Sequence, residues 1–149
     1  MSFNLNVDGI NVYLKINNYK PSNRNNWDSL WCKCDFMFSS GDWLNYHREN
    51  DEIILCSEIE ELASIFTMLI DGKIVEYKEV TLIEPDFVFQ LYPQTVNNSV
   101  LSDILVDWRV YFWYEGLTSN YLSITLNREE IIILRDYFLN IIKNIRLSS

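Results

Sequence analysis

The sequence has few of the residues on which most enzymes depend. Its 149 residues include one histidine, His47, and four glycines. Most acid–base and nucleophilic mechanisms near neutral pH use histidine. The sequence contains no G-x-G-x-x-G motif, P-loop or G-x-S-x-G elbow. A catalytic pair of carboxylates, like that of glycosidases, is still possible, because the fold can bring two of the 21 acidic residues together. The composition favours a binding protein over an enzyme.

Basic residues and long apolar runs are also scarce. There are 12 Lys and Arg against 21 Asp and Glu, which gives a net charge of -9. Because Lys and Arg supply most of the affinity for phosphates, direct binding of nucleic acid is disfavoured and a cationic partner is favoured. Arg135 and Asp136 interrupt the most apolar segment, so we expect no membrane span. The N-terminal residues lack the features of a secretory signal, and we therefore expect a cytoplasmic protein.

The three cysteines, Cys32, Cys34 and Cys56, are odd in number. Without an export signal, this count favours reduced thiols over a disulfide framework. Cys32 and Cys34 belong to a strand pattern, which lacks the tight turn that brings two thiolates together in zinc knuckles. A metal site that these cysteines share with His47 is therefore disfavoured. We expect buried, inert thiols that behave as small hydrophobes, and neither a metal nor another cofactor.

Apolar residues are abundant and follow the spacing of strands. They make up 48% of the chain, enough for one folded domain over residues 1–149. Asp8 and Gly9 predict the turn of a first hairpin, and the polar stretch 17–28 predicts a long loop. Alternation predicts a strand from Leu30 to Phe38 that pairs with a strand beginning near Trp43. Its core face is expected to carry Leu30, Cys32, Cys34, Phe36 and Phe38. Further strands are expected at residues 74–82, 87–92, 104–115 and 121–126.

Two capping boxes predict where helices begin. Ser57 with Glu60 starts a helix over residues 57–71, and Asn127 with Glu130 starts one over residues 128–146. Both segments carry apolar residues at the spacing of an amphipathic helix. The predicted fold class is α+β, with a curved antiparallel sheet or β-sandwich of about seven to nine strands and two amphipathic helices.

The strand pattern over residues 104–115 predicts one core face and one outer face. The core set is Ile104, Val106, Trp108, Val110, Phe112 and Tyr114, and the opposite set is Asp107, Arg109, Tyr111, Trp113 and Glu115. Trp, Tyr and Arg are the residues most common in binding hot spots. We therefore expect Arg109, Tyr111 and Trp113 to contact a partner. The alternative is that a helix or a second sheet covers this face.

Acidic residues concentrate around the start of the first predicted helix. The candidate partner-binding members are Glu49, Asp51, Glu52, Glu58 and Glu61. An anionic patch attracts a basic protein and speeds its capture. The alternative explanation is structural, because carboxylates near a helix N-terminus are stabilised by the helix dipole.

The order of motifs between Leu30 and Leu91 resembles the WapI-type immunity proteins, which are antidotes to bacterial polymorphic, contact-dependent toxins. The resemblance lies in the strand Leu30-Trp31-Cys32-Lys33-Cys34-Asp35, the turn Gly41-Asp42-Trp43, the helix with Glu61-Leu62, and the segment Leu82-Ile83-Glu84-Pro85-Asp86-Phe87-Val88-Phe89. This segment resembles the family's Glu-Pro element, and Glu84 and Pro85 are carried over as structural residues.

The resemblance implies a cytoplasmic, non-enzymatic protein that neutralises the C-terminal toxin domain delivered by a sibling cell. The acidic charge favours the same interpretation, because a toxin that cuts nucleic acid needs a basic surface that an acidic inhibitor can cover. The alternative is a small-ligand or carbohydrate-binding module that uses exposed Trp and Tyr rings. A hydrolase is the third possibility, and it would need a cleft with carboxyl groups of raised pKa.

Overall fold

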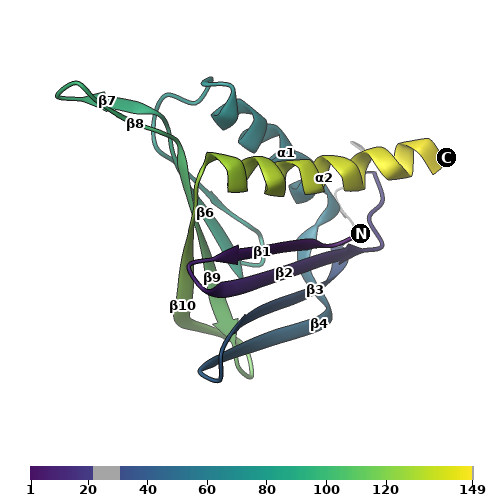
Figure 1. Cartoon of the computed structure of the whole chain (residues 1–149). Coiled ribbons are helices and arrows are strands. Elements are labelled where there is room, and N and C mark those ends of the chain that lie inside the picture. The colour runs from purple at the N-terminus through teal and green to yellow at the C-terminus, as the bar shows by residue number, and fades with distance from the viewer. Residues whose placement is uncertain (22–30, 149) are drawn as a thin grey trace. The chain divides into compact units, whose positions relative to one another are not determined.

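The computed structural model describes residues 1–21 and 31–148 of the chain (Figure 1). The described part contains two helices and ten strands, and every strand pair is antiparallel. The predicted α+β class is confirmed. No helix in these residues is both long and apolar enough to cross a membrane. The loop predicted at residues 17–28 falls mainly on residues 22–30, which lie outside the described ranges.

The chain divides into two compact units, one with residues 1–63 and the C-terminal residues from 136, the other with residues 64–135. We call them unit 1 and unit 2. The expectation of a single domain over residues 1–149 stays a prediction.

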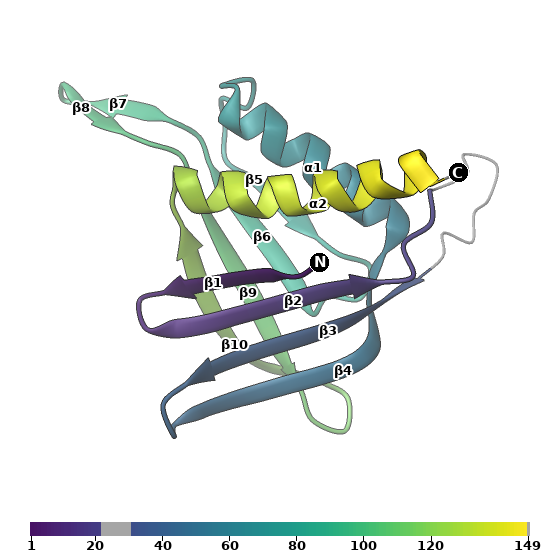
Figure 2. The same ribbon diagram turned by 45° about the vertical axis from the view of Figure 1, so that its right-hand side comes forward.

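Unit 1 contains a four-stranded sheet in the order β1-β2-β3-β4. Its strands are β1 (Phe3–Val7), β2 (Ile10–Asn17), β3 (Trp31–Ser40) and β4 (Leu44–Leu55), and Figure 2 shows them side by side. The predicted turn between the first two strands is confirmed, since Asp8 and Gly9 have φ angles of 51° and 84°. Positive φ at both central residues is the requirement of a type I′ hairpin.

One face of this sheet forms the core of unit 1. Cys32, Cys34, Phe36 and Phe38 alternate with partly exposed residues along β3 and are fully buried, as predicted. Tyr137 is also buried, and its hydroxyl accepts a hydrogen bond of 2.8 Å from the backbone N–H of Ile16. All three cysteines are buried free thiols, so their expected burial is confirmed.

Unit 2 contains the second sheet, in the order β10-β9-β6-β5. Its strands are β5 (Lys78–Thr81), β6 (Phe87–Tyr92), β9 (Leu105–Trp113) and β10 (Leu117–Leu126). Trp108 lies in the core, with ring centroids 5.2 Å from Phe87 and 5.4 Å from Phe89. Phe66 packs edge-on against Phe89 at 5.4 Å, so the part of helix α1 (Cys56–Ile70) that belongs to unit 2 packs on this face.

Two expectations for unit 2 are wrong in detail. The strand predicted at residues 74–82 begins only at Lys78. Tyr114, assigned to the core by alternation, is 78% exposed because β9 ends at Trp113 and Glu115 turns the backbone with a φ of 54°.

A short hairpin extends from the end of β6 and β9. Its strands are β7 (Thr95–Asn97) and β8 (Val100–Ser102), which we call the arm (Figure 1). The last pair between β6 and β9 is Tyr92 with Leu105, and the first pair of the arm is Thr95 with Ser102. The arm therefore continues the same register, and two unpaired residues on each side (93–94 and 103–104) separate it from the sheet. Asn98 and Ser99 form its turn with φ angles of 51° and 66°. Residues 95–102 contain no strong strand signal, and the two strands of the arm bring the described strands to ten, above the predicted seven to nine.

The helices are α1 (Cys56–Ile70) and α2 (Arg128–Ser148), within two residues of the predicted bounds. At α2 the predicted capping box is confirmed in full: Asn127 N–H donates to Glu130 Oε1 and Glu130 N–H donates to Asn127 Oδ1, both at 3.0 Å. The first helix begins one residue before Ser57. There the N–H of Leu55 donates a hydrogen bond to Glu58 Oε1 at 2.9 Å. Glu60 Oε1 accepts a hydrogen bond of 2.6 Å from the hydroxyl of Tyr19.

Replacing Asn127 with alanine should lower the free energy of unfolding by about 1 kcal/mol, since the N–H of Glu130 loses its acceptor. Urea denaturation followed by circular dichroism measures this. The control is Glu129→Ala, which removes an exposed carboxylate from the same turn and should cost only a few tenths of a kcal/mol. Equal losses in the two variants would contradict the capping role.

Candidate partner-binding surfaces

The outer face of β9 carries a preorganised cluster of one arginine and two tyrosines. Arg109 Nη1 donates to the Tyr111 hydroxyl at 3.2 Å, and its guanidinium carbon lies 4.2 Å from the centroid of the Tyr121 ring. The two tyrosine rings are 5.1 Å apart, because Tyr111 pairs with Tyr121 across β9 and β10. We call Arg109, Tyr111 and Tyr121 the outer cluster.

The outer cluster reaches the surface of the protein. Arg109 and Tyr111 are partly exposed, Tyr121 is 47% exposed, and Trp113 beyond them on β9 is 43% exposed. The hydrogen bond to Tyr111 raises the pKa of Arg109 above its ordinary value, so the guanidinium stays charged. Because the two tyrosine rings and the guanidinium already hold one another in place, these side chains would lose little conformational entropy on binding a partner.

The five acidic residues predicted to bind a partner differ in exposure and in their contacts within the protein. Glu49 and Glu52 on β4 and Glu61 on α1 are exposed. Asp51 is partly exposed and pairs with Arg48, with Nη2 to Oδ2 at 2.8 Å. Glu58 is 7% exposed and caps α1. Glu49 Oε1 also lies 3.5 Å from Nε2 of His47, which is itself exposed. Glu49, Glu52 and Glu61 are therefore the three whose side chains are exposed to solvent, and we call them the acidic set.

The structure thus brings some predicted site residues together. Glu49, Asp51 and Glu52 share β4, where register shifts against β3 mark irregular pairing. Arg109, Tyr111 and Trp113 share β9. The acidic set belongs to unit 1 and the outer cluster to unit 2.

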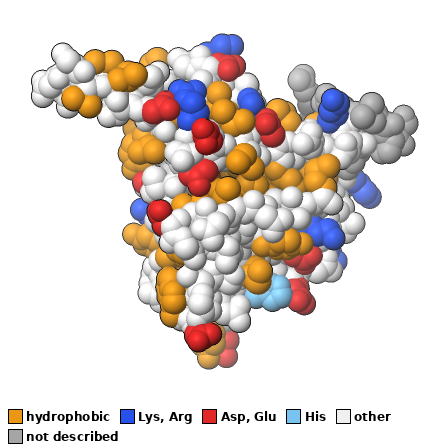
Figure 3. All heavy atoms as spheres, in the orientation of Figure 1, with side chains coloured by type: hydrophobic (Ala, Val, Ile, Leu, Met, Phe, Trp, Pro, Cys, Tyr) orange, Lys and Arg blue, Asp and Glu red, His pale blue; other side chains and the backbone are white. Residues whose placement is uncertain are grey.

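Sequence reasoning missed Tyr121 and the arm. Tyr121 was expected on a strand, but its position opposite Tyr111 depends on a register shift between Leu117 and Tyr121 that alternation does not reveal. The arm exposes three aliphatic side chains, Val96 at 71%, Val100 at 63% and Leu101 at 62%. Figure 3 shows this projection as hydrophobic and uncharged toward its tip.

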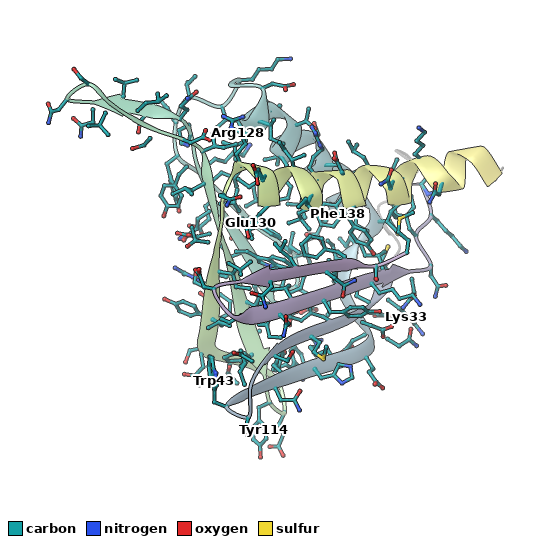
Figure 4. All side chains as sticks on the ribbon, viewed as in Figure 1. Lys33, Trp43, Tyr114, Arg128, Glu130 and Phe138 are labelled. Carbon is teal, nitrogen blue, oxygen red and sulfur yellow. The ribbon has the colours of Figure 1, made fainter. Side chains whose placement is uncertain are left out.

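Arg128 fixes the base of the arm to the helices of unit 2 (Figure 4). Its Nε and Nη2 atoms bind both carboxylate oxygens of Asp103 at distances of 2.7 to 3.1 Å. Its Nη1 donates to the carbonyl of Ile70, at the end of α1, at 3.2 Å. One side chain thereby joins the residue after β8, the end of α1 and the start of α2.

The outer face of β1, β2 and β3 contains a shallow hollow of about 400 Å³. It is lined by neutral polar and apolar residues: Asn4, Leu5, Asn6, Asn11, Val12, Tyr13, Met37 and Ser39. Asn6 and Asn11 are already joined by a hydrogen bond of 2.8 Å. Within residues 1–21 and 31–148, no group of three or more His, Cys, Asp or Glu side chains is placed to hold a metal ion.

The described residues thus form an α+β protein whose outer cluster reaches the surface, and the whole sequence carries a net charge of -9. The chain belongs to the WapI-like immunity protein family, whose model matches residues 3–145. The match extends well beyond residues 30–91, on which the sequence resemblance rested. A search of curated proteins finds no match. Family membership implies an immunity function against a toxin and a cognate toxin as partner, and such immunity proteins are generally non-enzymatic.

Replacing Arg128 with alanine should lower stability near neutral pH and have less effect in acid. Arg128 lowers the pKa of Asp103, so the pair contributes stability above the ordinary carboxyl pKa and loses it as the pH falls below about 4. Chemical denaturation at pH 7 and pH 3 measures the difference between the wild type and Arg128→Ala.

The control for this prediction is the same substitution in an Asp103→Asn background. There the effect of Arg128→Ala should no longer depend on pH, because the titrating carboxylate is gone. If the effect of Arg128→Ala depends on pH as strongly in the Asp103→Asn background as in the wild type, a titratable group other than Asp103 causes that dependence.

Proposed function

We propose that this protein binds the C-terminal domain of a cognate toxin in the cytoplasm and neutralises it by covering its active or substrate-binding surface. The observation that carries the proposal is the outer cluster, with Trp113 exposed beside it on β9. Aromatic and arginine side chains dominate the binding energy of protein interfaces, and those already held in place lose little entropy on binding.

The charge of the protein supports a basic toxin. The net charge is -9, and the acidic set is exposed to solvent. A nuclease must hold phosphates with Lys and Arg, so its substrate surface is positive. An inhibitor of opposite charge is attracted to that surface and, once bound, excludes the nucleic acid. This mechanism requires no chemistry from the inhibitor.

The outer cluster fits a protein partner better than a sugar. A carbohydrate platform needs a free aromatic face, whereas Arg109 lies over the ring of Tyr121. Trp43 and Tyr114, which Figure 4 labels, are 69% and 78% exposed and lie outside the strands, in a turn and a bend. The outer cluster therefore supports the toxin-binding proposal over the carbohydrate alternative.

The experiment that tests the proposal is affinity capture of the tagged protein from its native host, with washes at low and high salt. We expect a basic toxin domain that is retained less well at high salt. The captured domain is then expressed alone and assayed on DNA and RNA, where an equimolar amount of this protein should abolish its activity. A captured domain that stays fully active would contradict neutralisation.

Reversing the acidic set with Glu49→Lys, Glu52→Lys and Glu61→Lys together should slow association at least tenfold at low salt. The rate should also depend less on ionic strength, because steering is lost. Stopped-flow mixing with the captured toxin domain measures both quantities.

The matched control changes the net charge equally at three exposed residues outside the acidic set: Asp71→Lys, Glu76→Lys and Glu129→Lys. It should slow association much less. If both triple variants slow association equally, the net charge of the protein attracts the toxin and the position of the acidic set does not matter.

Replacing Trp113 with alanine should weaken toxin binding by about 2 kcal/mol, or roughly thirtyfold in Kd, mainly through faster dissociation. Surface plasmon resonance measures both rates. The control is Leu101→Ser on the arm, which also removes an exposed apolar side chain in unit 2. If Leu101→Ser weakens binding and Trp113→Ala does not, the partner contacts the arm and leaves β9 uncovered.

A further inference from the structure

Two buried thiols of unit 1 lie in direct contact. The Sγ atoms of Cys32 on β3 and Cys56 at the first residue of α1 are 2.8 Å apart, and the two side chains are 0% and 1% exposed. A disulfide bond is about 2.05 Å long, so the sulfurs need to approach by only about 0.8 Å. Both residues are held by regular structure, since Cys32 pairs with Ile54 in the ladder of β3 and β4.

We propose that Cys32 and Cys56 are an oxidisable dithiol, which closes to a disulfide when a hydroperoxide reaches it. The bond would link β3 to the start of α1 and enclose the β3–β4 hairpin. This inference does not depend on the proposed function, because it concerns chemistry inside unit 1 alone. Since both sulfurs are buried, the oxidant must be small, and a peroxide meets this condition where a protein oxidoreductase does not.

Cys56 is the thiol that reacts first. The hydrogen bond from Cys32 lowers the pKa of Cys56, although burial opposes this effect, and Cys56 also lies at the N-terminus of α1, where the helix dipole favours a thiolate. The same contact raises the pKa of Cys32. Because Cys56 alone of the two lies at a helix N-terminus, we assign the nucleophile to Cys56 and the resolving thiol to Cys32.

The reaction has two balanced steps. The Cys56 thiolate attacks one oxygen of the hydroperoxide, an S–O bond forms, the O–O bond breaks, and hydroxide or alkoxide leaves. The Cys32 sulfur then attacks the sulfur of the sulfenic acid. An S–S bond forms, the S–O bond breaks, and the thiol proton leaves with the hydroxide as water. Two electrons pass from the two thiols to one peroxide.

Cys34 provides an internal control. It lies on the same buried face of β3 and donates to the carbonyl of Cys32 at 3.7 Å. Burial raises the pKa of Cys34 to about 12, so it remains a thiol. A nonspecific oxidation would involve all three cysteines, whereas the proposed reaction spares Cys34.

The test is to treat the folded full chain with hydrogen peroxide, remove the peroxide with catalase, and alkylate under denaturing conditions. The number of alkylated thiols should fall from three to one, and dithiothreitol should restore three. Trypsin cleaves after Arg24, Lys33, Arg48 and Lys73, so each cysteine falls in a different peptide. Mass spectrometry should find peptide 25–33 linked to peptide 49–73, with the loss of two hydrogens.

Two variants complete the experiment. Cys34→Ala should form the same link, and Cys32→Ser should form none. The oxidised wild type should unfold roughly 5–10 °C higher than the reduced protein, because closing this loop restricts the unfolded chain. Three alkylated thiols after peroxide treatment, a link through peptide 34–48, or sulfinic acid on Cys56 without a link would each overturn the proposal.

Discussion

The alternation of side chains along β9 is the constraint on which unit 2 depends. The strand is paired on both sides, with β6 and with β10, so its register is fixed by two ladders at once. Trp108 then points into the core against Phe87 and Phe89, while its neighbour Arg109 points outward. A slip of one residue would bury the guanidinium and expose the indole, which the core cannot tolerate. The position of the outer cluster is therefore a consequence of core packing.

Local signals in the sequence predicted most of the regular structure. The Asp8-Gly9 turn, the buried face of β3 and the capping box of Asn127 with Glu130 each depend on residues close together in the chain. Such features follow from backbone preferences and from the period of the hydrophobic pattern. They predict the fold class because sequential antiparallel strands need only short turns.

The features that the sequence did not predict depend on distant contacts or on weak turn signals. The arm has strands of only three residues around Asn98 and Ser99, where a hairpin usually shows Asn-Gly. The outer cluster needs Tyr121 beside Tyr111, a pairing that follows a register shift in β10. The acidic pattern of the sequence predicts Glu58 at the surface, whereas the structure buries its side chain, which caps α1. In each case tertiary structure decides the role of a residue whose type alone leaves several roles open.

The proposed interface separates the rate of capture from the lifetime of the complex. Long-range attraction depends on exposed charge, so in the proposed interface the acidic set would act on association, whereas the outer cluster and Trp113 would act on dissociation through close contact. The two groups lie in different compact units. An inhibitor that must reach a toxin before it acts, and then hold it, benefits when these two rates are set by separate residues.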